Sequence, residues 1–392
     1  MSFRVLLPRT VLILGTVSFL NDTASEMITP LLPLFLTATL GAGPAVVGLV
    51  EGVAEATASL LKLVSGRLAD RGWNHKRLVI GGYGSSNLAR PLIGLALSWG
   101  WVLLLRFLDR VGKGVRTSPR DALIAASADD DRRGLAFGFH RALDNAGAML
   151  GPLLAFVLLS MGLPMGHVFL WSVIPGVLGV ALLIFGLDDT PSKAPASPPP
   201  PLTWKGLDGR IRGLILASGL IALASAPEAF LVLWASDRGL TLAWVPLVWA
   251  AASGVKAIIA APAGALSDRY GRSRILIGGW GLRILVLILL ALASGGQGET
   301  VTWTLFLAYA AALAATEGAE RALIGDFAHT RERATAFGLY HMVVGLAALP
   351  GALLFGGMWQ LWGARRAFLL AAVISVTSVV VLYHYVRVLR SA

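Results

Sequence analysis

Two carboxylates lie one helical turn apart near the start of the chain. Asp22 and Glu26 fall within an apolar stretch over residues 10–39, and a spacing of four places them on one face of a helix. Carboxylates that share an apolar, low-dielectric site raise each other's affinity for protons. The pair is therefore a candidate proton-coupling or substrate site; the alternative is a structural salt bridge or a helix bend at Pro30.

A second group of charges follows a helical stripe within residues 101–123. Arg106, Asp109 and Arg110 recur at spacings of three and four, so they share a face. Each arginine could pair with an acidic residue of the first two apolar stretches, including Glu55, or hold an anionic substrate group by two parallel hydrogen bonds. Both interpretations make these residues candidates for a cavity that binds protons or substrate.

Two further places hold charges inside apolar stretches. His140, Arg141 and Asp144 lie within about one turn, where His140 and Asp144 could relay a proton or Arg141 and Asp144 could pair with each other. Glu228 lies at a position in the second half of the chain that mirrors Glu26. Because an ionisable group at membrane depth costs roughly 2.5–3.5 kcal/mol, each is a candidate for function.

These charges need a scaffold of apolar helices. The chain has 392 residues, of which 56% are hydrophobic and 14% charged. A helix that crosses a bilayer needs about 20 mostly apolar residues. Twelve stretches meet this requirement and predict an all-α polytopic membrane protein. They are residues 10–39, 45–69, 78–98, 101–123, 134–160, 166–187, 210–236, 243–267, 274–294, 301–327, 334–358 and 364–388.

The chain also repeats itself at an offset of about 200 residues. Ala122-Leu123-Ile124 and Ala136-Phe137-Gly138 both recur 200 residues later. A proline-rich stretch that disfavours helix lies between the copies. We therefore expect two pseudo-symmetric six-helix bundles related by a parallel repeat. The expected division is a bundle at 1–187, a cytoplasmic linker at 188–209 and a bundle at 210–392.

The net charge of +11 reflects membrane topology. Lysine and arginine concentrate in alternate loops, which is the positive-inside pattern, so we expect both termini in the cytoplasm, a bacterial-type inner membrane location and no nucleic-acid partner. The chain has no cysteine, which removes disulfides and thiolate metal sites. No cofactor and no resident metal are expected.

Two loops carry a shared pattern of glycine, aspartate and arginine. The copies are Gly66, Asp70 and Arg71, and Gly264, Asp268, Arg269, Gly271 and Arg272. The second copy closely resembles the signature loop of the major facilitator superfamily, whereas the first departs from it after Arg71. The resemblance implies a gate in which an aspartate and an arginine lock the cytoplasmic side closed. The alternative is a capping turn whose charges set the topology.

The fifth apolar stretch is rich in small residues. It contains Gly138, Gly147, Gly151 and Pro152, followed by Ala155. Small residues four apart allow close helix contact, and proline can bend a helix. The pattern resembles the antiporter motif of drug-type exporters in the same superfamily, with Ala155 in place of the last glycine. The resemblance implies a hinge between bundles; the alternative is ordinary small-residue packing.

The resemblance covers nearly the whole chain and implies a monomeric transporter, not an enzyme, that works by alternating access. The first hypothesis is proton-coupled efflux of a small molecule by antiport. The alternatives are proton-coupled symport of an organic anion, which the arginine stripe suggests, and divalent metal export through carboxylate ligands. A membrane enzyme or sensor is disfavoured because the sequence shows no nucleophile elbow, nucleotide-binding loop or histidine cluster.

Overall fold

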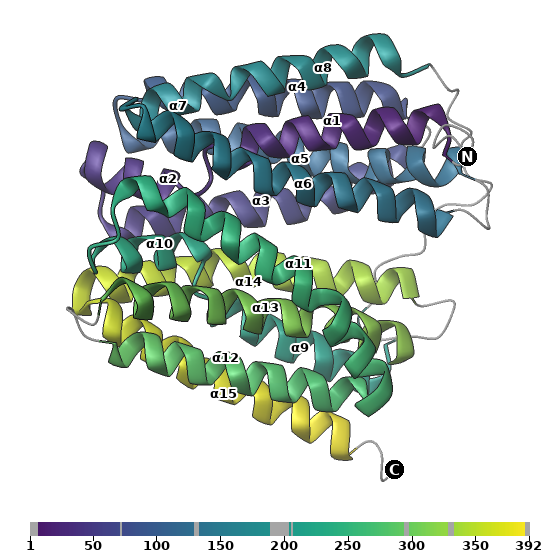
Figure 1. Cartoon of the computed structure of the whole chain (residues 1–392). Coiled ribbons are helices and arrows are strands. Elements are labelled where there is room, and N and C mark those ends of the chain that lie inside the picture. The colour runs from purple at the N-terminus through teal and green to yellow at the C-terminus, as the bar shows by residue number, and fades with distance from the viewer. Residues whose placement is uncertain are drawn as a thin grey trace. The chain divides into compact units, whose positions relative to one another are not determined.

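The computed structural model describes residues 7–70, 73–128, 133–188, 204, 207–293, 298–327 and 333–388, and its regular structure there is entirely helical (Figure 1). Most of the expected linker at 188–209 lies outside the described residues, as do Arg71 and the side chain of Asp70. The prediction of an all-α chain is confirmed over the described part.

The helices follow the predicted spans to within a few residues. The first half contains α1 (Arg9–Glu26), α2 (Leu32–Leu34) with a π-helical turn (Phe35–Thr39), α3 (Pro44–Asp70), α4 (His75–Leu92), α5 (Trp99–Ser127), α6 (Arg133–Ser160), α7 (Met165–Trp171) and α8 (Val173–Gly186). The second half contains α9 (Gly209–Leu223), α10 (Glu228–Ser236), α11 (Val245–Tyr270), α12 (Arg272–Leu292), α13 (Glu299–Phe327), α14 (Arg333–Trp362) and α15 (Ala364–Val388).

Eight segments of the described chain are long and apolar enough to cross a membrane. They are α3, α6, α7 with α8, α9 with α10, α11, α12, α14 and α15. The remaining long helices, α1, α4, α5 and α13, complete the predicted twelve, and each carries several charged residues. Two of the less apolar helices, α1 and α5, carry candidate charges, and so do the apolar spans α3 and α6.

The two halves use the same helix pairs. In the first half α1 packs on α6 and α8, and α4 packs on α5 and α8; in the second half α9 packs on α14 and α15, and α12 packs on α13 and α15 (Figure 1). A Cβ added to Gly151 would lie 2.5 Å from the carbonyl oxygen of Thr23, and one added to Gly351 would lie 2.7 Å from that of Leu223. Both contacts repeat at an offset of 200, so the repeat in sequence is also a repeat in structure.

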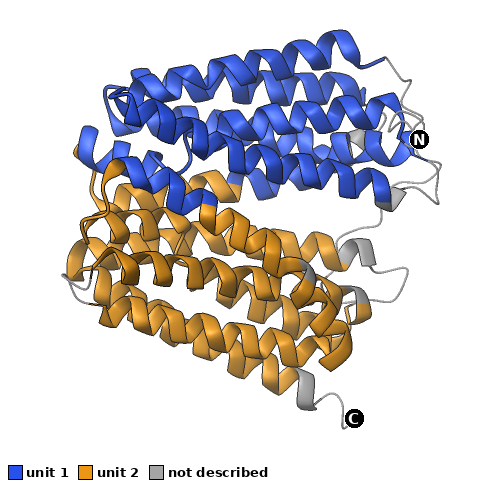
Figure 2. Cartoon of the chain, in the orientation of Figure 1, with its two compact units in different colours: residues 1–40, 57–199, 243–250 blue, residues 41–56, 200–242, 251–392 orange. Residues whose placement is uncertain are grey.

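The chain forms two compact units (Figure 2). The first comprises residues 1–40, 57–199 and 243–250, and the second comprises residues 41–56, 200–242 and 251–392. The first unit thus includes the start of α11, and the second includes the N-terminal part of α3. Neither unit is a single continuous run of the chain.

Each unit has its own apolar core. In the first, Leu14, Tyr83 and Ile124 are fully or almost fully buried among residues of α1, α4, α5 and α8. In the second, Trp280 and Leu382 are similarly buried among residues of α9, α12, α13 and α15. Since lipid is as apolar as these side chains, close packing stabilises such cores more than removal from lipid does. The cores hold the charged helices in fixed orientations.

Candidate functional site

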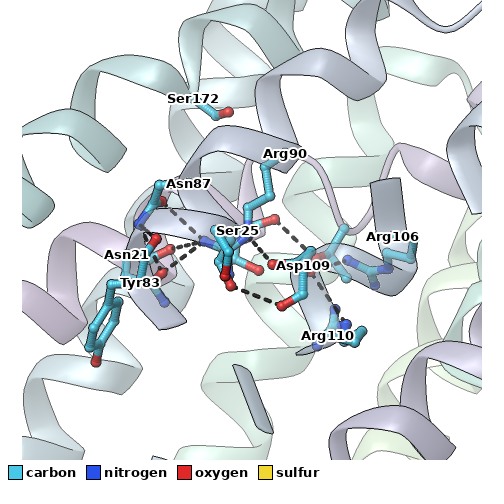
Figure 3. A network of polar contacts seen from close by, with 12 residues as sticks. Asn21, Ser25, Tyr83, Asn87, Arg90, Arg106, Asp109, Arg110 and Ser172 are labelled. Carbon is cyan, nitrogen blue, oxygen red and sulfur yellow. Dashed lines mark hydrogen bonds and ion pairs between the residues drawn. The ribbon is translucent and has the colours of Figure 1, made fainter. Parts of the chain in front are cut away.

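Asp109 of α5 is the centre of an ion-pair cluster inside the first unit (Figure 3). Arg90 Nε lies 2.8 Å from Asp109 Oδ1, and Arg106 Nη1 and Arg110 Nε each lie 3.5 Å from Asp109 Oδ2. The side chain of Asp109 is 0% exposed, and those of Arg90 and Arg106 are 3% exposed. Three guanidinium groups therefore lie within ion-pair distance of one buried carboxylate.

A hydrogen-bonded chain connects this cluster to α1. Arg90 Nη1 donates to the side-chain oxygen of Asn21 at 2.8 Å and to its backbone carbonyl at 3.1 Å. Asn21 Nδ2 in turn donates to Asp22 Oδ1 at 2.9 Å. The predicted proton site at Asp22 is thus linked to Asp109 through Asn21 and Arg90.

Arg116 extends the polar region one to two turns along α5. Its guanidinium carbon lies 4.4 Å from the centre of the Tyr83 ring, and its Nη1 donates to Ser86 Oγ at 2.7 Å. Ser86 Oγ donates to the backbone carbonyl of Asp109 at 2.8 Å. An aromatic face and a hydroxyl therefore hold this buried cation.

Glu26 is held by an aromatic donor. Its Oε2 accepts a hydrogen bond of 2.9 Å from the indole nitrogen of Trp249, which lies in the part of α11 that belongs to the first unit. Both Asp22 and Glu26 are partly buried, and neither of their hydrogen bonds is an ion pair. Arg106 and Arg110, expected as possible partners of Asp22, Glu26 or Glu55, both lie 3.5 Å from Asp109 Oδ2 of their own helix.

The charges of α6 lie on two different faces. His140 Nδ1 lies 3.5 Å from Asp144 Oδ2, and His140 is buried, whereas Arg141 is exposed. Asp144 lies close enough to Asp22 for the two carboxylates to interact electrostatically. The expected group at 140–144 is thus divided, and its histidine and aspartate accompany the carboxylate of α1.

The second unit holds a smaller set of polar residues. Lys256 Nζ lies 2.6 Å from Glu228 Oε1, and both side chains are about two-thirds buried or more. Arg283 Nη2 donates to Ser225 Oγ at 2.8 Å. Glu55 is exposed and lies in the part of α3 that belongs to this unit. The predicted site residues are therefore distributed over both units, with most of them in the first.

The second copy of the loop motif makes its contacts inside the second unit. Arg272 lies 3.2 Å from Asp268 at the end of α11 and 2.5 Å from Asp326 of α13, and its Nη1 donates to the carbonyl of Ala322 at 3.1 Å. Gly271 has φ +98°, a backbone conformation that glycine adopts at little cost. These contacts tie the ends of α11 and α13 to the start of α12.

The glycines of α6 pack that helix on α1. A Cβ on Gly147 would collide with the carbonyl oxygen of Phe19, and one on Gly151 would lie 2.5 Å from that of Thr23. A Cβ on Gly138, by contrast, would have nothing within 4 Å, and Pro152 is buried within α6. The motif therefore makes a close helix contact within the first unit.

Arg90 and its neighbour Asn87 were not among the residues predicted from the sequence. Asn87 Nδ2 lies 3.4 Å from Asn21 Oδ1 and 2.9 Å from the carbonyl of Tyr83. The signal was available, because an asparagine and an arginine three residues apart occupy one face in the middle of a predicted span. Such a polar pair at membrane depth is costly unless neighbouring helices supply partners.

Comparison with known proteins identifies the family. A family model described as Major Facilitator Superfamily matches residues 14–319 and 251–391. The chain is 31% identical over 379 residues to an uncharacterised MFS-type transporter of Methanocaldococcus jannaschii, covering 95% of this chain and 94% of that protein.

Solved structures of low sequence identity share the fold. A bacterial homologue of the human lysosomal transporter Spinster, in an inward-facing and unoccupied conformation, matches with a TM-score of 0.79 at 18% identity, over 99% of this chain and 98% of its own. A POT family transporter in complex with a thioalcohol-conjugated peptide matches with a TM-score of 0.81 at 13% identity, over 96% of each chain. The chain therefore belongs to the major facilitator superfamily, and it is a membrane transporter rather than an enzyme.

Proposed function

We propose that the chain is a proton-coupled antiporter that exports a small molecule, with Asp22 and Glu26 as its proton-carrying groups. The observation that carries this proposal is the chemistry of their partners, an amide for Asp22 and an indole for Glu26. Both partners are neutral donors. Either carboxylate can therefore take up a proton without leaving a contacting cation unpaired.

Asp109 differs in this respect. Its two oxygens face Arg90, Arg106 and Arg110, so a proton on this carboxylate would leave three guanidinium groups facing one another. Removing one partner of a buried ion pair is strongly destabilising. We assign to Asp109 the role of holding α4 and α5 together, and to the acids of α1 the role of carrying protons.

The position of α1 supports coupling to a conformational change. This helix bears both carboxylates and also receives Gly147 and Gly151 of α6 at close range. A change of charge on α1 therefore acts on a tightly packed helix pair. A ligand that binds two states with different affinity shifts their populations, and a proton on α1 would act in this way during alternating access. The likeness of the α6 motif to that of drug-type exporters supports efflux as the direction.

The same proposal places the protein in a cytoplasmic membrane as a monomer. The positive-inside pattern supports cytoplasmic termini and a cytoplasmic linker at 188–209 between two six-helix bundles. A small molecule and protons are its partners, together with the surrounding bilayer.

One observation favours a second candidate, the symport of an organic anion with protons. Arg90, Arg106, Arg110 and Arg116 are all buried in the first unit, and Asp109 is the carboxylate that pairs with three of them. Buried guanidinium groups can hold a carboxylate or phosphate group of a substrate by two parallel hydrogen bonds. Antiport and symport predict opposite relative directions of proton and substrate.

The test uses proteoliposomes that enclose a pH-sensitive dye and are challenged with cationic, neutral and anionic compounds. We expect a compound that triggers proton movement opposite to its own movement. The double variant Asp22→Asn with Glu26→Gln is expected to insert normally and to lose this proton movement by at least about tenfold, because amides cannot carry the proton.

A matched control is Glu317→Gln, a change at a half-exposed ion pair with Arg321 in α13. It should leave coupling near the level of the natural chain. Proton movement in the same direction as the compound would favour the symport candidate. Unchanged, pH-dependent transport in the double variant would remove Asp22 and Glu26 from the mechanism.

A further inference from the structure

We propose that Arg90 is a positioning residue that fixes the orientation of the Asn21 amide and so makes Asn21 a hydrogen-bond donor to Asp22. This inference rests on the proposed role of Asp22 as a proton carrier. It assigns a function in proton coupling to a residue of α4 whose own charge does not change.

The two ends of an asparagine amide are chemically different, since the oxygen only accepts and the nitrogen only donates. Asn21 Oδ1 faces Arg90 Nη1 at 2.8 Å and Asn87 Nδ2 at 3.4 Å, and both of these atoms are donors. A guanidinium group stays protonated and has no acceptor atom. Reversing the amide would place donors against donors. Asn21 Nδ2 is therefore directed toward Asp22 Oδ1, at 2.9 Å.

Arg90 is itself held from a second helix. Its Nε donates to Asp109 Oδ1 at 2.8 Å, and its Nη1 also lies 3.3 Å from Asn87 Oδ1 (Figure 3). The residue is 2% exposed, so water does not compete for these contacts. The ion pair with α5 thus orients the guanidinium group that orients the amide in α1.

The orientation of this amide matters for proton binding. An N–H group that donates to a carboxylate stabilises its charged form, whereas a carbonyl oxygen in the same place would stabilise the protonated form. Charged or titratable groups that also act on Asp22 are His140 and Asp144 from α6 and Lys113 and Arg116 from α5. Glu26 lies on the same helix, α4 contributes Arg90 itself, and α8 carries no titratable side chain. These groups are the same in the variants compared below, and Arg90 acts on Asp22 through Asn21.

The test is an infrared titration of the Asp22 carboxyl group in the purified full-length protein, with the band assigned by its loss in Asp22→Asn. Arg90→Lys keeps the charge near Asp109 but replaces two separate donor nitrogens, Nε toward Asp109 and Nη1 toward Asn21, by a single ammonium nitrogen without the fixed fork geometry. We expect the protonation midpoint of Asp22 to move up by about one pH unit or more, which corresponds to the loss of one hydrogen bond to a charged group.

Arg106→Lys is the matched control. It also replaces a buried guanidinium that pairs with Asp109, but the described hydrogen bonds of Asn21 do not include Arg106. We expect its midpoint to stay within about 0.3 pH units of the natural value, because the Asn21 amide keeps its orientation. Equal shifts of the Asp22 midpoint in the two lysine variants would overturn the inference. Arg90 would then act only as one of the cations of the ion-pair cluster.

Asn21→Ala tests the same relay without touching Asp109. It should reproduce the upward shift of Arg90→Lys, and the double variant should shift no further, since both changes remove the same hydrogen bond. Additive shifts would show that Arg90 acts on Asp22 by another route. If Asp22 of the natural chain takes up no proton at any pH at which the protein stays folded, the proposed proton site itself fails, and this inference fails with it.

Discussion

Asp109→Asn is expected to destabilise the protein by about 3–5 kcal/mol, the range for breaking a buried ion pair by removing one partner. The asparagine is close in size to aspartate, so the change removes charge with little change in packing. Arg90, Arg106 and Arg110 would then lose the negative charge that lies within 3.5 Å of each of them. Their mutual repulsion inside a nearly dry cluster is the physical source of the loss.

The measurement is the thermal unfolding midpoint of the purified protein in detergent, together with the yield of folded protein in the membrane. Asp268→Asn is the matched control because its carboxylate is 67% exposed and pairs with Arg272 at 3.2 Å. Exposed ion pairs contribute about 0–1 kcal/mol, so this variant should unfold near the natural midpoint. Similar midpoints for the two variants would mean that the cluster does not depend on the charge of Asp109.

The positions of the helices could be predicted from the sequence because bilayer thickness sets a minimum length of apolar chain. Each predicted span recurs as one, two or three consecutive helical segments, although α1, α4, α5 and α13 are not among the eight segments that are long and apolar enough to cross a membrane. Apolar runs of about 20 residues or more were sufficient to predict where the helices lie. The repeat was also visible, since Gly151 and Gly351 make corresponding contacts in the two halves.

The partners of the charges could not be predicted in the same way. Rotation of a helix about its axis is set by packing, which the order of residues does not reveal. Arg106 was therefore predicted as a partner of Asp22, Glu26 or Glu55, and its pairing with Asp109, three residues along its own helix, was not predicted. Helix geometry alone could have predicted this pair, because side chains three residues apart are neighbours on one helix face. Arg90 was missed because its role depends on Asn21, which lies 69 residues away in the chain.

The motif in α6 shows the same limit. Gly147 and Gly151 predicted a close helix contact, and both make one. The spacing of the glycines could not predict that the neighbouring helix is α1. Gly138, which belongs to the same motif, makes no such contact. Within this motif, Gly147 and Gly151 pack against α1, whereas Gly138 has open space around it. Alanine substitutions at these positions can test this difference.

Gly151→Ala is expected to lower stability by about 1–3 kcal/mol and to reduce transport. The new methyl group would lie 2.5 Å from the carbonyl oxygen of Thr23 and 2.9 Å from Glu26 Cβ, so α1 and α6 must move apart. Overpacking of this kind carries a cost of that size. Gly138→Ala, in open space on the same helix, should be neutral or more stable by about 0.5–1 kcal/mol, since alanine favours helix over glycine. Equal stability and transport in the two variants would show that α1 and α6 can move apart at little energetic cost.

Gly351→Ala separates the effect on packing from the effect on the site. Its methyl group would lie 2.7 Å from the carbonyl oxygen of Leu223, the corresponding contact between α14 and α9, and the three atoms nearest to it are backbone atoms of Leu223 and Ala222. Both alanine variants should therefore lower the unfolding midpoint. Because the methyl group at position 151 displaces Glu26, only Gly151→Ala should also change the pH dependence of proton movement in proteoliposomes. A changed pH dependence in both variants would place the coupling in the general packing of the two repeats rather than in the carboxylates of α1.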